Sequence, residues 1–152
     1  MASYFRRLIN SVSIYRNVET FLKEELSIRR YSYIDEEDAE GKIKKQLVAK
    51  FGNTNVDNQH HIGGSTGLKC DIDLFDGKCG IEIKLADKLS NSAELQRAIG
   101  QVAYYSFNLY RDADLILLVV GDEAEPNRKL NDLKKIIEQF DGVHFIYKQT
   151  KK

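Results

Sequence analysis

Long apolar runs are missing from this 152-residue sequence. No stretch approaches the roughly 18 apolar residues that a membrane-spanning helix needs. The first residues become amphipathic where a secretory signal would place an apolar block. These absences favour a cytoplasmic protein that has no membrane partner.

Cysteine and proline are also scarce. The two cysteines, Cys70 and Cys79, lack the tight spacing of a zinc site or a disulfide framework, which predicts buried free thiols. The single proline, Pro126, lies in a loop over residues 121–127. Because we find no internal repeat or linker, the chain is expected to form one globular unit, large enough for a real core.

Charge of one sign is not in excess, since 23 basic residues balance 23 acidic ones. A neutral chain argues mildly against broad, strong binding of nucleic acid. The distribution is nevertheless uneven: residues 1–34 hold six Arg or Lys and three Glu, a net charge of +3, and an acidic run follows from Asp35 to Asp38. An acidic site and a basic surface on the same chain would cancel in the net charge.

Apolar periodicity predicts helices and strands that alternate along the chain. Helical segments are expected over 5–12, 14–26, 35–51, 92–109 and 129–140, strands over 56–62, 114–120 and 143–148, a loop over 63–67 and a hairpin over 69–86. The order predicts an α/β fold, with residues 1–34 as an N-terminal helical extension and residues 35–152 as the main domain. In the strand over 56–62, His60 and His61 face opposite sides, and we interpret them as solvated or structural.

The hairpin is the most informative segment, because apolar and polar residues alternate on both sides of Asp76-Gly77. That dipeptide is a strong signal for a two-residue turn. Such a turn pairs Phe75 with Lys78, and the numbers of all paired residues then sum to 153. One face is apolar and is the expected core; it contains Cys70, Ile72, Leu74, Ile81, Ile83 and Leu85.

The opposite face of the hairpin brings charged residues together. Asp71 lies opposite Glu82 in this register, and Lys84 shares the face because it is two residues further along the strand. Asp73 is a rival to Asp71, but it lies opposite Gly80, so Asp71 is preferred. Two carboxylates this close repel each other unless a cation neutralises them. Lys84 alone is one such cation, and a divalent metal ion such as Mg²⁺ or Mn²⁺ is the other.

At these residues the chain resembles the PD-(D/E)xK nuclease superfamily. Asp71 followed by Glu82-Ile83-Lys84 looks like its defining motif, with Cys70 in place of the proline. Gln101 to Tyr105 is similar to the QxxxY motif of bacterial recombination exonucleases, and Glu40 resembles the glutamate of the first core helix. The resemblance covers residues 35–148.

The resemblance implies a restriction-endonuclease-like αβββαβ core, with a mixed sheet flanked by helices, and a metal-dependent nuclease. Asp71 and Glu82 would hold Mg²⁺, with Mn²⁺ as a substitute and the Ile83 carbonyl as a further ligand. Lys84 would orient or activate the attacking water. The remaining implied site residues are Glu40, which would act through a metal-bound water, and Gln101 and Tyr105, which would position the substrate or the lysine.

Several alternatives stay open at this point. Glu36 and Glu37 are rivals of Glu40, and Tyr104 competes with Tyr105 for the core. The expected partner is nucleic acid, with DNA preferred, and a homodimer or a larger protein complex is compatible with the sequence. The alternative function is a catalytically inactive module on the same fold that binds nucleic acid or protein.

Overall fold

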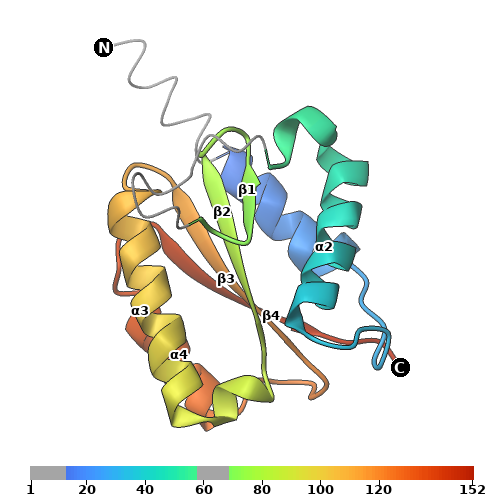
Figure 1. Ribbon diagram of the computed structural model, residues 1–152, viewed down its shortest axis with the longest axis vertical. Coiled ribbons are helices and arrows are strands. Elements are labelled where there is room, and N and C mark those ends of the chain that lie inside the picture. Colours follow the sequence, from blue (N-terminus) through green and yellow to red (C-terminus); the bar gives the residue numbers. More distant parts are fainter. Residues whose placement is uncertain (1–12, 58–68) are drawn as a thin grey trace.

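A four-stranded mixed sheet lies between two layers of helices (Figure 1). The computed structural model describes residues 13–57 and 69–152. The strands, in the order β1-β2-β3-β4, are β1 (Ile72–Leu74), β2 (Cys79–Leu85), β3 (Asp114–Gly121) and β4 (Val143–Gln149). The hairpin makes β1 antiparallel to β2, whereas helical crossovers make β2, β3 and β4 parallel. The expected α/β fold with a mixed sheet flanked by helices is therefore confirmed.

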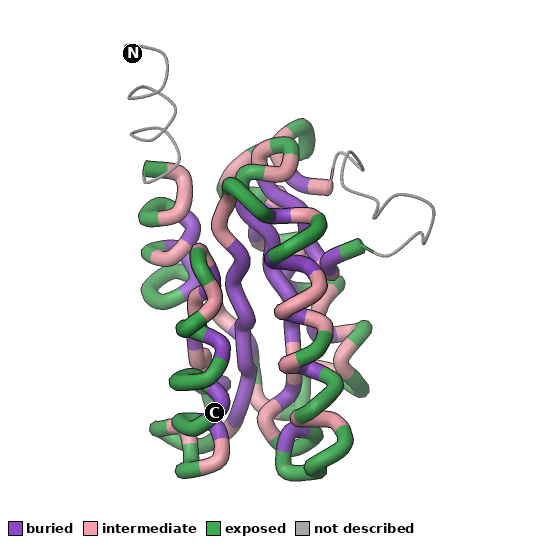
Figure 2. Tube along the Cα trace, turned by 90° about the vertical axis from the view of Figure 1, so that its left-hand side faces the viewer, coloured by how far each residue is buried: buried purple, intermediate pink, exposed green. Residues whose placement is uncertain are grey.

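The helices divide between the two faces of the sheet. They are a first helix over 13–20 continued by the π-helical η1 (Phe21–Glu25), then α2 (Glu36–Phe51), α3 (Ser92–Asn108) and α4 (Arg128–Ile137), with the short 3₁₀ turns η2 (Asn53–Asn55) and η4 (Lys88–Ser90). The first helix and α2 share one apolar core with one face of the sheet, and α3 and α4 share another with the opposite face. Figure 2 shows the buried strands between helices whose outer sides are exposed.

Helix α2 is positioned by its cap and its buried stripe. The Asp35 carboxylate accepts a hydrogen bond from the Asp38 N–H at 2.9 Å, which satisfies one of the free donors at the helix start. Ala39, Ile43 and Leu47, at helical spacing, are fully buried against the sheet. The helix predicted over 35–51 is thus confirmed, and its first turn is fixed beside β2.

The hairpin register is confirmed, but its turn is longer than predicted. Ile72 pairs with Ile81, and the ladder ends where Leu74 pairs with Cys79. Phe75 does not pair with Lys78, because it has a positive φ of 53° and its N–H donates to the carbonyl of Asn55 at 2.8 Å. The turn therefore spans residues 75–78, and the charged face keeps its predicted partners.

Two further expectations need correction. Cys70 packs in the core beneath α3 and not with Ile72 and Leu74, because it precedes β1, where strand alternation no longer fixes its side. Of the strand predicted over 56–62, Val56 forms an isolated bridge with Leu74. Residues 58–62 with His60 and His61, the loop over 63–67 and the helix over 5–12 lie outside the described residues.

The N-terminal segment packs into the main core. Five apolar residues of the described part are buried against α2 and the sheet: Val18, Phe21, Leu22, Leu26 and Ile28. Cys70 and Cys79 are both buried and free, as predicted. Among the described residues, none of the helices combines the length and apolarity needed to cross a bilayer.

Candidate active site

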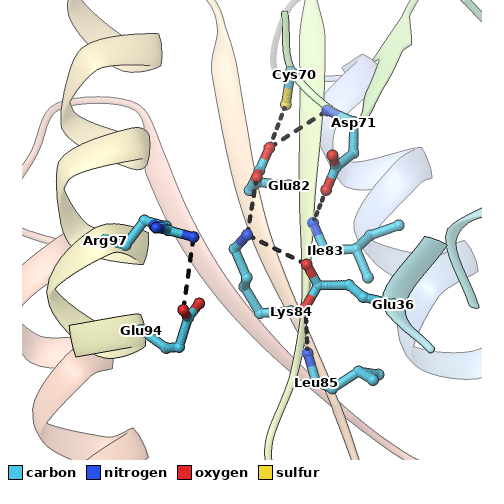
Figure 3. Close-up of polar contacts among 9 residues, drawn as sticks. All are labelled: Glu36, Cys70, Asp71, Glu82, Ile83, Lys84, Leu85, Glu94 and Arg97. Atoms are coloured by element: carbon cyan, nitrogen blue, oxygen red, sulfur yellow. Dashed lines mark hydrogen bonds and ion pairs between the residues drawn. The ribbon is translucent and has the colours of Figure 1, made fainter. Parts of the chain in front are cut away.

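The site forms where β2 extends beyond its short neighbour. Strand β1 pairs only with Cys79 to Ile81, so among the residues that the structure describes the remainder of β2 has no strand partner on that edge. Two carboxylates satisfy the backbone donors there: Ile83 N–H donates to Asp71 Oδ2 at 2.8 Å, and Leu85 N–H donates to Glu36 Oε2 at 3.2 Å (Figure 3). Because an unpaired buried backbone group is costly, these acids complete the sheet edge.

Glu82 and Lys84 project from β2 toward α3, on the face opposite to Ile81 and Ile83. The Lys84 Nζ lies 3.4 Å from Glu82 Oε1 and 3.4 Å from Glu36 Oε1. The other Glu82 oxygen accepts from the Asp71 N–H at 3.4 Å. The structure therefore brings Asp71, Glu82 and Lys84 together as the hairpin register predicts, and it adds Glu36.

Burial and mutual repulsion disfavour the charged forms of these acids. Burial, followed by the charge of Asp71, raises the pKa of Glu82 to about 7, against the opposing effect of Lys84. Burial also raises the pKa of Asp71, although the hydrogen bond from Ile83 N–H and the charge of Lys84 favour its ionised form. For Lys84, burial favours the neutral form, but the surrounding carboxylates outweigh it and raise the pKa. Lys84 is therefore a protonated cation in this site.

Helix α2 contributes two acids one turn apart. Burial, then the charges of Asp71 and Asp57, raise the pKa of Glu40 to about 7, so these two acids disfavour its ionised form. Glu36 precedes it by four residues and makes the ion pair with Lys84. Glu37 is exposed. The sequence prediction favoured Glu40 over Glu36, whereas in the structure Glu36 contacts Lys84 and Glu40 is affected by the charge of Asp71. Their i, i+4 spacing was the signal that could have identified the pair.

Helix α3 carries Gln101 and Tyr105 one turn apart, so the two residues share one helix face. Tyr105 is buried, and the pKa of its phenol is raised by burial and then by the charge of Glu82, which lies nearby. The Gln101 Oε1 atom is buried, and within the described residues it has no hydrogen-bond partner. Tyr104 is only partly buried. Of the two tyrosines, Tyr105 therefore lies in the core and near the carboxylates.

Asp73, the rival of Asp71, has a different environment. Its carboxylate accepts from the Tyr110 hydroxyl at 2.7 Å and from the Gly77 N–H at 3.1 Å. Tyr110 packs over Gly80, where an added Cβ would lie 2.4 Å from the ring. Asp73 thus links the turn to the segment that follows α3, and Asp71 is the acid that contacts β2 beside Glu82.

The donor set is small. Within 13–57 and 69–152, no three His, Cys, Asp or Glu side chains are grouped so that they could hold a metal ion. Comparisons with protein-family models, curated proteins and solved structures found no match. The function therefore has to be argued from the chemistry of the site.

Proposed function

We propose that this protein is a metal-dependent nuclease that hydrolyses phosphodiester bonds and that its substrate is DNA. One observation carries the proposal: Asp71, Glu82 and Lys84 meet at the edge of β2, and Glu40 of α2 is within range of the charge of Asp71, although these residues come from two separate segments of the chain. The resemblance to PD-(D/E)xK nucleases assigns the same four residues to one centre. We also propose that the α/β fold is a restriction-endonuclease-like core, and this assignment depends on the same resemblance.

The charge of the site suits a divalent cation. Burial raises the pKa of Asp71, Glu82 and Glu40 together, so their ionised forms lack sufficient positive charge nearby. Carboxylate and carbonyl oxygens are the ligands that Mg²⁺ prefers. Asp71, Glu82 and the Ile83 carbonyl would hold Mg²⁺ or Mn²⁺. When bound, the ion would supply an activated water and would stabilise negative charge on the phosphate.

The side chains around the acids have distinct tasks in this proposal. Lys84 is protonated in the metal-free protein, and it would orient or activate the attacking water or donate hydrogen bonds to the phosphate. Glu40, with a pKa of about 7, is suited to exchange a proton near neutral pH. Gln101 and Tyr105 would orient the substrate or the lysine from α3.

Cleavage assays with a panel of DNA and RNA substrates in Mg²⁺ or Mn²⁺ test the proposal. Glu82→Gln and Lys84→Met are expected to lose metal-dependent cleavage while keeping a native circular dichroism spectrum. The exposed Glu125→Gln serves as the control for loss of a carboxylate and should cleave like the wild type. Unchanged cleavage in either site variant would refute the mechanism.

A second candidate is the inactive binding module on the same fold. It is favoured by the position of Lys84, which already bridges Glu82 and Glu36 and so neutralises part of the charge without a metal. This candidate predicts no heat of Mg²⁺ binding and no cleavage of any substrate, together with specific binding of nucleic acid or protein. Calorimetric titration with Mg²⁺ separates the two.

A further inference from the structure

One face of α3 continues from the site toward solvent. Glu94, Arg97, Gln101 and Tyr105 follow one another at spacings of three and four, so they share that face. Tyr105 is buried beside Glu82, and Gln101 has a buried, unpartnered oxygen. In Figure 3 the side chains of Arg97 and Glu94 point from α3 toward the side of the site where Lys84 lies.

The Arg97 side chain is weakly held and can exchange its ion-pair partner. Its only ion pair in the described part of the chain is with Glu94, at 3.6 Å, and 67% of the Arg97 side chain is exposed. Such an exposed i, i+3 pair contributes little to stability. By contrast, Lys84 is 11% exposed and bridges two carboxylates, and Lys44 is paired with Asp57. Arg97 is thus a cation that can change partners at small cost.

A polynucleotide strand needs such a cation. The acids Glu36, Glu40, Asp71 and Glu82 outnumber Lys84, so the site repels phosphates that no metal contacts. The guanidinium group matches a phosphate with paired hydrogen bonds. We propose that Arg97 releases Glu94 and binds a phosphate next to the scissile one, so that the preferred substrate is a strand with at least two phosphates. This inference rests on the proposed nuclease function.

The test compares the hydrolysis of two substrates by the 152-residue protein. A DNA oligonucleotide has flanking phosphates, whereas bis(p-nitrophenyl) phosphate is a single phosphodiester and has none. Arg97→Ala should raise KM for the oligonucleotide about tenfold with kcat unchanged, and the slope of log KM against log salt should fall by about 1. Hydrolysis of bis(p-nitrophenyl) phosphate should stay at the wild-type rate. Arg97→Lys should recover part of the loss.

Arg111→Ala is the matched control, since Arg111 is exposed and follows the opposite end of α3. The inference is overturned if Arg97→Ala has the same KM for the oligonucleotide as this control. It is also overturned if the hydrolysis of both substrates falls by the same factor. In either case, wild-type cleavage that depends on Glu82 would leave the proposed function standing. If the wild type hydrolyses neither substrate, the proposed function and the inference fail together.

Discussion

Replacing Glu40 by glutamine is expected to stabilise the metal-free protein above neutral pH. Burial and the charges of Asp71 and Asp57 raise the pKa of Glu40 from 4.5 to about 7 in the folded protein. Between these values the folded protein binds more protons than the unfolded chain, so the free energy of unfolding falls as pH rises. The contribution of Glu40 is fully present below pH 4.5 and is lost as pH rises through about 7.

The magnitude follows from the same values. A rise in pKa from 4.5 to about 7 corresponds to at most about 3.4 kcal/mol. Glu40 is partly exposed, so water screens its charge, and we expect Glu40→Gln to gain only about 1 kcal/mol at pH 8. For a chain of this size that gain raises Tm by roughly 2–4 °C. At pH 5, where Glu40 is already protonated, the two proteins should be nearly equal.

Urea denaturation in EDTA at pH 5 and pH 8 measures this difference. Glu37→Gln is the control, because it removes an exposed carboxylate from the same helix and should change stability by less than about 0.5 kcal/mol. The reasoning about Glu40 is wrong if Glu40→Gln is less stable than the wild type at pH 8, or if its gain is equal at both pH values. Mg²⁺ should reduce the difference in stability between Glu40→Gln and the wild type at pH 8, since it would neutralise the acids of the wild-type site.

Four other substitutions test the site and the packing next to it. Lys84→Met should cost about 3 kcal/mol at pH 8 and less at pH 5, because it leaves buried carboxylates unpaired; an equal cost at both pH values in urea denaturation would contradict this. Asp71→Asn should abolish the calorimetric heat of Mg²⁺ binding, whereas Asp73→Asn should keep it and lose about 2 kcal/mol of stability; the reverse would make Asp73 the ligand. Gly80→Ala should cost about 1–3 kcal/mol, because the new Cβ would overlap the Tyr110 ring, and an unchanged Tm would argue against that packing.

The elements of the fold that depend on neighbouring residues in the sequence, such as helix caps and apolar periodicity, could be predicted. The helix after Asp35 has a side-chain cap and an apolar stripe, and the strand over 114–120 is a continuous apolar run; both formed as expected. The hairpin register followed from a turn centred on Asp76-Gly77, and it holds although the turn spans residues 75–78. The position of Phe75 could not be predicted, because it depends on the Phe51 ring at the end of α2 and on the carbonyl of Asn55 in η2, which are distant in the sequence.

The candidate site divides in the same way. Glu82 and Lys84 share a face because of strand geometry alone, so their proximity could be predicted. The contact between Glu36 and Lys84 joins residues 48 positions apart and depends on how α2 packs beside the edge of β2. Sequence periodicity places Glu36 and Glu40 on one helix face, but the rotation and height of that helix decide which of them reaches the lysine.

The structural task of Asp71 determines how its chemical task must be tested. Its Oδ2 atom accepts the Ile83 N–H at 2.8 Å, at a position where β1 no longer supplies a backbone partner. Asp71→Ala would leave that donor unpaired, at a cost of about 1–3 kcal/mol, whereas Asp71→Asn keeps an acceptor oxygen. We therefore expect the alanine variant to be less stable than the asparagine variant by about that amount, with Mg²⁺ binding lost in both. Equal stabilities in urea denaturation would mean that the carboxylate does not hold the strand edge, and alanine could then replace asparagine as the test of the metal site.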